Sequence, residues 1–247
     1  MLGVQSNPVR YGYMVDLVRH ICENRDKAQP LSILEIGSWV GASAISWATA
    51  INTYNNGLGL VTCVDPWEEY RTYRKTSNAP DDRMNVLFEH EIPSTLFNHN
   101  IRAYGLEDLI ISIKSTGKKI ISQLPDESFD IIYQDGNRLL DHIIDDIGLA
   151  KPKIKDGGYL VGDDLVLQVH EVNQEEMAIA IDQNIEMIKD SRTEKIYLPG
   201  LTLAVSKCFS KVSVENGFWW VKRNGNEWLP IKIALTNGIP DHIANWV

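Results

Sequence analysis

The chain has no excess of basic residues and no long apolar run, and each absence excludes a class of protein. Its 247 residues include 24 Lys and Arg against 33 Asp and Glu, which gives a net charge of −9 at pH 7. Phosphate binding favours clustered basic residues, so we expect no nucleic acid as the main partner. No run reaches the roughly 18 apolar residues that a membrane span requires, so we expect no membrane partner.

Cysteine is scarce, and the three cysteines lie far apart in the sequence. None of Cys22, Cys63 and Cys208 has the spacing of a metal-ligand set, and their number is odd. The N-terminal residues, MLGVQSNPVRYGYMVD, contain no apolar signal region. We therefore expect a reduced, cytoplasmic protein.

Residues 31–41, LSILEIGSWVG, form the stretch around which the chain is organised. An apolar run ends in Gly37, Gly41 follows four residues later, and small residues with helical periodicity come next. The pattern predicts a buried strand, a tight glycine turn and the start of a helix. Because glycine has no Cβ, such a turn lets a ligand approach the backbone, and the helix behind it offers unpaired N–H groups.

The dinucleotide fingerprint G-x-G-x-x-G is absent, which weighs against the alternative of a nicotinamide-dependent oxidoreductase. The turn instead reads E-x-G-x-x-x-G, and a carboxylate beside the loop repels phosphate and suits a cationic ligand. This stretch resembles the first motif of the class I S-adenosylmethionine-dependent methyltransferases. By that resemblance, the loop residues that bind the cofactor are Glu35, Gly37, Ser38 and Gly41.

A second predicted strand, 58–64, ends at Asp65-Pro66-Trp67. In nucleotide-binding α/β units, an acid at this place accepts hydrogen bonds from the ribose hydroxyls, and one carboxylate can serve two adjacent hydroxyls. We therefore predict that Asp65 and Pro66 bind the cofactor. The alternative is that Asp65 is a turn residue, since Asp-Pro favours turns. Trp67 is expected either to shield the adenosine or to lie in the core.

Strand and helix patterns alternate five times in the first two thirds of the chain. Further strands are predicted at 109–114, 129–134 and 159–162, after a turn at 155–158. Helices are predicted at 8–25, 42–50, 86–104, 118–124 and 139–151. This order predicts a parallel sheet with helices on both faces.

A hairpin signal follows, because Glu215-Asn216-Gly217 separates the short apolar runs 212–214 and 218–221. An antiparallel pair that closes a parallel sheet is the usual ending of the methyltransferase fold. We predict an α/β fold with a doubly wound, mostly parallel, seven-stranded Rossmann-like sheet, closed by this antiparallel hairpin.

We expect a single domain, 1–247, with several segments around the sheet. The inserted segment 165–198, with a helix at 173–189, is expected to be a lid or a subunit contact, which makes a homodimer one expectation. The remaining segments are an N-terminal helical part at 1–30, a polar surface loop at 68–85, a short helix at 199–209 and a tail at 223–247.

Polar residues follow the third, fourth and fifth predicted strands. In parallel sheets of this kind the ligand binds beyond the carboxyl ends of the strands, so these residues should converge on one cleft. Ser115 and Thr116 are expected beside the adenine, and Asp135 is expected beside the cofactor. Asp135, Asp163 and Asp164 together form an acidic cluster that is costly without a cation, and oxygen ligands suit Mg²⁺ or a similar ion. The alternative for Asp163-Asp164 is a turn or a helix cap.

The stretch FDIIYQDG…KDGGYLVGDD resembles the metal-dependent small-molecule and sugar O-methyltransferases of the macrocin O-methyltransferase-like group. The resemblance spans residues 31–222 and implies that Asp135, Asp163 and Asp164 hold a divalent metal, with Mg²⁺ as the first choice. It also implies methyl transfer from S-adenosylmethionine to a hydroxyl of a small molecule, such as a sugar or a glycosylated natural product.

One residue departs from that group's pattern, which is D-G-x-H with the His as candidate base. Here Arg138 takes that place, and arginine is a poor base at neutral pH but can bind an anion or stabilise an oxyanion. The catalytic candidates are therefore Asp135, Arg138 and His142, with His170 and Glu171 as further candidate bases. The departure leaves a second hypothesis open, namely a cofactor-binding protein with weak or lost catalysis.

Overall fold

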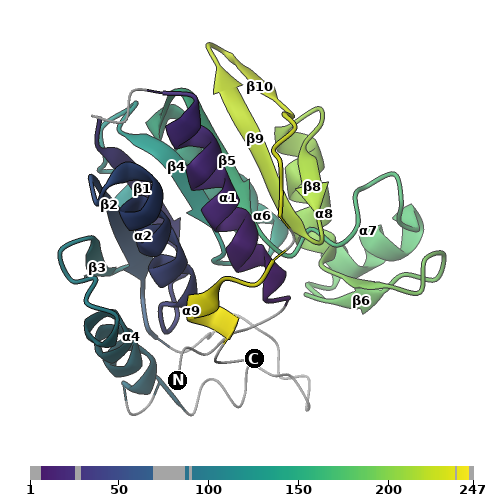
Figure 1. Ribbon diagram of the computed structural model, residues 1–247. Coiled ribbons are helices and arrows are strands. Elements are labelled where there is room, and N and C mark those ends of the chain that lie inside the picture. Colours follow the sequence, from purple (N-terminus) through teal and green to yellow (C-terminus); the bar gives the residue numbers. More distant parts are fainter. Residues whose placement is uncertain (1–6, 26–28, 69–86, 89–90, 237, 245–247) are drawn as a thin grey trace. The chain divides into compact units, whose positions relative to one another are not determined.

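The computed structural model describes residues 7–25, 29–68, 87–88, 91–236 and 238–244 (Figure 1). These residues form two compact units. One contains the chain up to Thr116 together with the segment from Ile233 onward, and the other contains Gly117–Lys232. Strands and helices alternate along the chain, and the fold is of the expected mostly parallel α/β class.

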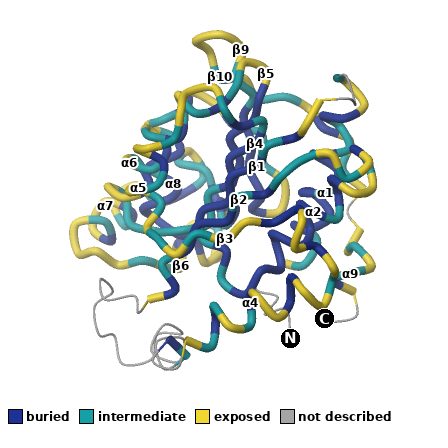
Figure 2. The backbone as a smooth tube through the Cα atoms, turned by 90° about the vertical axis from the view of Figure 1, so that its left-hand side faces the viewer, coloured by how far each residue is buried: buried dark blue, intermediate teal, exposed yellow. Residues whose placement is uncertain are grey.

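The first unit is built on three parallel strands. Its elements are α1 (Val9–Glu23), β1 (Leu31–Ile36), α2 (Ala42–Asn55), β2 (Gly59–Asp65), α4 (Ile92–Ala103), β3 (Ile110–Lys114) and α9 (Asp241–Ala244). Strand β2 pairs with β1 on one side and β3 on the other, and both pairs are parallel. Five of the six residues of β1 are buried, which a strand covered on both faces requires (Figure 2).

The C-terminal segment is tied to helix α1. The carboxylate of Asp16 accepts hydrogen bonds from the Thr236 N–H at 2.7 Å and the Thr236 hydroxyl at 3.0 Å. A Cβ on Gly12 would lie 2.1 Å from the carbonyl oxygen of Gly238, so helix α1 needs glycine where the segment crosses it. The end of the predicted tail is therefore part of the first unit.

The second unit combines two parallel strands with antiparallel ones. Its helices are α5 (Gly117–Ile121), α6 (Leu140–Ala150), a 3₁₀ turn at Lys151–Lys153, α7 (Gln174–Asp182) and α8 (Pro199–Cys208). Its strands are β4 (Phe129–Gln134), β5 (Ile154–Gly162), β6 (Ile188–Lys189), β7 (Ile196–Tyr197), β8 (Ser213–Glu215), β9 (Phe218–Asn224) and β10 (Glu227–Leu229). Strands β4 and β5 are parallel, whereas β9 is antiparallel to β5, β8 and β10. The β8–β9 pair confirms the predicted hairpin.

The structure differs from the predicted elements at several places. Strand β5 begins at Ile154 and contains the predicted turn at 155–158, with a register shift against β4 that absorbs the extra residues. Strand β10 was missed because it has only three residues. The predicted helix 173–189 ends at Asp182, because Asn184 adopts a left-handed φ of 53° and its N–H donates to the carbonyl of Ile181.

The 165–198 segment has its own small core. Leu167, Val172, Met177 and Tyr197 are buried together. The carboxylate of Asp190 accepts hydrogen bonds from the N–H groups of Asn173 and Thr193, at 2.6 and 2.8 Å. The segment is therefore a folded insertion, and its role as a lid or subunit contact stays a prediction.

Some expectations fall where the structure gives no description. The predicted loop 68–85 lies outside the described residues except for its first position, and so do positions 86, 89 and 90 of the predicted helix 86–104. Among the residues that are described, no helix combines the length and the apolar character needed to cross a membrane.

Candidate active site

A turn with two left-handed glycines connects strand β1 to helix α2 in the first unit. Gly37 and Gly41 have φ angles of 90° and 93°, a region that residues with a Cβ rarely adopt. Gly41 directly precedes α2, and a Cβ on it would lie 3.1 Å from the ring of Phe97. Backbone conformation and packing therefore both require glycine at position 41.

Asp65 joins the end of β2 to this glycine turn. Its Oδ2 accepts a hydrogen bond from the N–H of Trp39 at 2.9 Å, and its Oδ1 accepts one from the N–H of Trp67 at 2.7 Å. Burial raises the pKa of Asp65, while the N–H groups of Trp39, Trp67 and Ser38 oppose the rise. A carboxylate has about four acceptor positions, so these bonds leave capacity for ribose hydroxyls.

Two tryptophans complete the connection between the loops. The Trp67 indole N–H donates to the carbonyl of Trp39 at 2.7 Å, and both residues have left-handed φ angles, 46° for Trp39 and 45° for Trp67. Trp67 is buried against Phe97, with ring centroids 5.2 Å apart. Of the two expectations for Trp67, shielding the adenosine or lying in the core, the structure therefore supports a place in the core.

Glu35 is fully buried and ties strand β1 to helix α2. Its Oε1 accepts a hydrogen bond from the Ser43 hydroxyl at 3.0 Å. Cys63 lies opposite Glu35 on strand β2, and burial raises the pKa of its thiol, with the Glu35 carboxylate adding to the rise. Cys63 is therefore a protonated core residue, as its apolar strand suggested.

The first unit gathers the predicted cofactor-binding residues at the carboxyl ends of its parallel strands. The N–H of Ser115 donates to the carbonyl of Asp65 at 3.1 Å, which places the end of β3 beside the end of β2. Pro66 is half-buried there and Thr116 is exposed. The residues that meet at this edge are Gly37, Ser38, Gly41, Asp65, Pro66 and Ser115.

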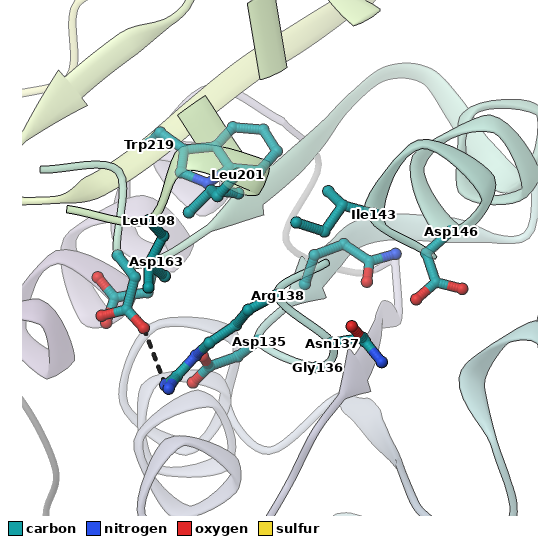
Figure 3. Close-up of a pocket in the computed structure, with 12 residues that line it drawn as sticks. Asp135, Gly136, Asn137, Arg138, Ile143, Asp146, Asp163, Leu198, Leu201 and Trp219 are labelled. Atoms are coloured by element: carbon teal, nitrogen blue, oxygen red, sulfur yellow. Dashed lines mark ion pairs between the residues drawn. The ribbon is translucent and has the colours of Figure 1, made fainter. Parts of the chain in front are cut away.

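Arg138 lies among carboxylates in the second unit (Figure 3). Its Nη2 is 3.0 Å from Oδ2 of Asp164, which follows β5, and its Nη1 is 3.3 Å from Oε1 of Glu186, in the 165–198 segment. Burial lowers the pKa of Arg138. The negative charges of Asp164, Asp135 and Glu186 raise the pKa by more than burial lowers it, so the net shift is upward. The guanidinium is therefore permanently charged.

The three predicted metal ligands line one cavity together with Arg138. Asp163 is almost fully buried, and Asp164 has a left-handed φ of 64°. Asp135 accepts a hydrogen bond from the Tyr133 hydroxyl at 3.0 Å. The ends of β4 and β5 bring these acids to one cavity, as the order of the strands predicts.

Two cavities adjoin at Arg138. The smaller has a volume of about 30 Å³ and is lined by Asp135, Asp146, Asp163, Asp164, Leu201 and Trp219, among others. The larger has a volume of about 210 Å³ and is lined by Arg138, Leu139, His142, Ile181, Asn184 and Ile185, among others. Arg138 lines both, so one side chain borders the acidic cavity and the cavity beside the inserted segment.

Sequence reasoning missed Asp146 as a candidate base. This half-buried carboxyl group lines the acidic cavity, and burial raises its pKa to about 6. The predicted base His142 is exposed on the same helix and lines the larger cavity. The sequence pattern could have indicated Asp146. It follows the inward-facing Ile143 by three residues on α6 and so lies on the same helix face.

The other candidate bases have structural roles or lie away from both cavities. Glu171 accepts a hydrogen bond from the N–H of Gln168 at 2.7 Å, which closes a turn, and His170 is exposed in the same turn. Asn137, in the D-G-x-H position that precedes Arg138, accepts a hydrogen bond from the N–H of Leu139 at 2.9 Å, which closes a turn just before α6.

The residues of the acidic cavity do not fit a divalent metal as they stand. Within the described parts of the chain, no group of three or more His, Cys, Asp or Glu side chains is arranged to hold a metal ion. Asp164 already pairs with a guanidinium, whose positive charge repels a second cation. The expected Mg²⁺ site is therefore not formed by this arrangement of side chains.

Comparisons with known proteins agree with this fold. A family model described as a methyltransferase domain matches residues 34–165. The search of curated proteins found no match. The O-methyltransferase NovP has a TM-score of 0.60 at 16% identity, and the match covers 87% of this chain and 80% of that one.

Two further solved structures have the same fold. A putative caffeoyl-CoA O-methyltransferase from Staphylococcus aureus has a TM-score of 0.53 at 13% identity, over 90% of this chain and 86% of that one. The O-methyltransferase TomG from Streptomyces achromogenes, in complex with SAM, has a TM-score of 0.50 at 16% identity, over 91% and 82%. At these identities the similarity establishes the fold alone.

Proposed function

Because the chain belongs to the methyltransferase domain family and is an S-adenosylmethionine-dependent methyltransferase, we propose that it methylates a hydroxyl oxygen of a small molecule. The observation that carries the proposal is Asp65, held at the end of β2 by N–H groups of Trp39 and Trp67 beside the glycine turn. NovP and TomG are both described as O-methyltransferases, which supports an oxygen acceptor. The resemblance of the FDIIYQDG stretch supports a sugar or a glycosylated natural product.

The reaction forms a bond between the acceptor oxygen and the methyl carbon and breaks the bond between that carbon and sulfur. Bound S-adenosylmethionine supplies the activated methyl group, and the sulfur keeps the electron pair of the broken bond. The protein must hold the acceptor in line and remove its hydroxyl proton. In the proposed reaction the Arg138 guanidinium stabilises negative charge on the acceptor oxygen, since it lines both cavities of the second unit.

Two side chains compete for the role of base. Asp146 has a pKa of about 6, near the value that suits a base at neutral pH, and it lines the acidic cavity. His142 lines the larger cavity. We assign the proton to Asp146, because its carboxyl group shares a cavity with Asp135 and Arg138.

Metal assistance was expected from the resemblance, but the residues present do not fit it. The cation beside the acids is Arg138, so the proposed reaction uses the charges of the chain itself. We further propose a cytoplasmic enzyme with a hydroxylated small molecule as partner. A homodimer through the inserted segment is proposed because Ile179, Met187 and Ile196 are exposed there.

Calorimetry with S-adenosylhomocysteine tests whether the protein binds the cofactor. An assay of methyl transfer to a panel of sugars and catechols tests whether it methylates a hydroxyl group. Binding of S-adenosylhomocysteine together with methylated product supports the enzyme. Binding without product from any acceptor class favours the alternative of a cofactor-binding protein without turnover, which the loss of the D-G-x-H histidine motivates. No binding of S-adenosylhomocysteine would contradict both.

A further inference from the structure

We infer that Arg138 is a built-in cation that occupies the place of the divalent metal among Asp135, Asp163 and Asp164, so that this enzyme acts without a metal ion. The inference deepens the proposed function and rests on it for the reaction that the cation serves. The arrangement of charged groups around the guanidinium does not depend on the proposed reaction, and it can be tested without cofactor or acceptor.

The guanidinium makes its contacts from a fixed backbone. The carbonyl of Arg138 would lie 2.6 Å from a Cβ on Gly200, and the N–H of Leu140 would lie 2.9 Å from it, so the start of helix α8 packs directly on this backbone. The Asn137 side chain accepts a hydrogen bond from the N–H of Leu139 and closes a turn across position 138. The backbone of Arg138 is therefore fixed by the turn and by the packing of α8.

The contacts of the side chain link three parts of the second unit. Asp164 follows strand β5, Glu186 lies in the inserted segment, and Asp135 follows β4 and adds to the electrostatic field at Arg138. The bonded side chains are only 21% and 17% exposed, for Asp164 and Glu186, so water screens these contacts incompletely. A metal ion bound by Asp164 would have to displace the guanidinium or approach it closely.

The guanidinium can also do part of the work of a metal. It has five N–H donors, and its ion pairs with Asp164 and Glu186 use only one donor each from Nη2 and Nη1. The remaining donors can hold an oxyanion at the border of the two cavities. Hydrogen bonds to single oxygens do not require the paired hydroxyls that a chelating metal favours, so acceptors with one hydroxyl fit this site as well as vicinal diols.

Electron paramagnetic resonance of Mn²⁺ with the purified 247-residue chain tests the inference directly, because bound and free Mn²⁺ give different signals. The wild type should leave Mn²⁺ free. Arg138→Gln should bind Mn²⁺ at least about tenfold more tightly than the wild type, because the acids lose their internal cation. The added Asp163→Asn change should abolish that gain.

Two matched variants test whether a gain of Mn²⁺ binding is specific to the loss of positive charge at position 138. Arg223→Gln removes the same charge from an ion pair with Glu127 elsewhere in the second unit, and it should not gain Mn²⁺ binding. Arg138→Lys keeps the positive charge and should behave as the wild type does. If Arg138→Gln fails to fold, as judged by circular dichroism, Arg138→Met gives the same test with a neutral side chain.

The outcomes separate this inference from the proposed function. Mn²⁺ binding by the wild type that Asp163→Asn abolishes would overturn the inference, whatever the enzyme methylates. No gain in folded Arg138→Gln or Arg138→Met would overturn it too. Failure to bind S-adenosylhomocysteine would instead contradict the proposed function and leave the Mn²⁺ result unaffected. Where methyl transfer is observed, EDTA should reduce the rate by less than about twofold if Arg138 replaces the metal.

Discussion

The carboxylate of Asp65 accepts the N–H of Trp39 at 2.9 Å, across 26 residues of sequence, and so fixes the glycine turn against the end of strand β2. The same carboxylate accepts the N–H of Trp67. One side chain thus orders two loops and, in the proposed function, faces the ribose. Structure and cofactor binding therefore depend on the same group, and they must be separated by a control.

Asp65→Asn should weaken S-adenosylhomocysteine binding by about tenfold or more, because an amide has fewer acceptor positions than a carboxylate. It should also lower the free energy of unfolding by about 1–3 kcal/mol, since one buried N–H loses its acceptor. Calorimetry and denaturant unfolding measure the two effects.

Asp16→Asn is the matched control, because Asp16 accepts backbone and hydroxyl hydrogen bonds from Thr236 in the same unit. It should lose stability to a similar extent and keep its affinity for S-adenosylhomocysteine. Equal losses of affinity in the two variants would show that Asp65 acts through stability alone.

Gly41→Ala should destabilise the first unit and weaken the cofactor site together. The φ of 93° costs alanine about 1–2 kcal/mol, and the added Cβ presses on the ring of Phe97 at 3.1 Å. Gly105→Ala is the comparison, because its φ is 63° and a Cβ there meets no atom within 4 Å. Thermal unfolding should show the smaller loss for Gly105→Ala, and a loss at least as large would argue against the contact with Phe97.

The rate of methyl transfer should rise with pH through about 6 and then level off, because the carboxylate form of Asp146 is the base and burial raises its pKa to about 6. Asp146→Asn should remove this limb of the pH profile and lower kcat. Asp145→Asn is the control, since the neighbouring Asp145 is exposed and pairs with Lys118 at 2.7 Å. If the rise of the rate with pH were kept in Asp146→Asn and lost in His142→Gln, the base would be His142 and not Asp146.

Stability should depend on His242 at acidic pH. Burial lowers the pKa of His242 to about 4, and its Nε2 lies 2.8 Å from the Ser46 hydroxyl. The unfolded chain takes up a proton as the pH falls below about 6.5, whereas the folded chain resists protonation until about pH 4, so stability is lost across this window.

The difference in melting temperature between the wild type and His242→Gln should therefore change between pH 7 and pH 4, with the wild type losing more. His99→Gln removes an exposed histidine on α4 and should show no such change. A difference for His242→Gln that is constant over this pH range would contradict a buried neutral imidazole.

Local patterns in the sequence are sufficient to specify individual strands, turns and helices of the fold. The apolar run before Gly37 and the small residues after Gly41 specify a strand, a turn and a helix, because hydrophobic period and glycine conformation act over a few residues. Strands β1 and β4 were predicted to within a residue or two of their bounds for this reason. The order of these units also sufficed to predict that the acids after β4 and β5 share one edge.

The pairing of charged side chains, in contrast, follows from packing in three dimensions. Arg138 pairs with Glu186, 48 residues later in the chain, in a segment whose helix ends earlier than its apolar period suggested. Helix α7 ends early because Asn184 adopts a left-handed backbone conformation, which the spacing of apolar residues does not predict. The presence of a guanidinium among predicted metal ligands likewise depends on side-chain direction. Long-range distances of this kind follow from packing, and the pattern of a single sequence does not contain them.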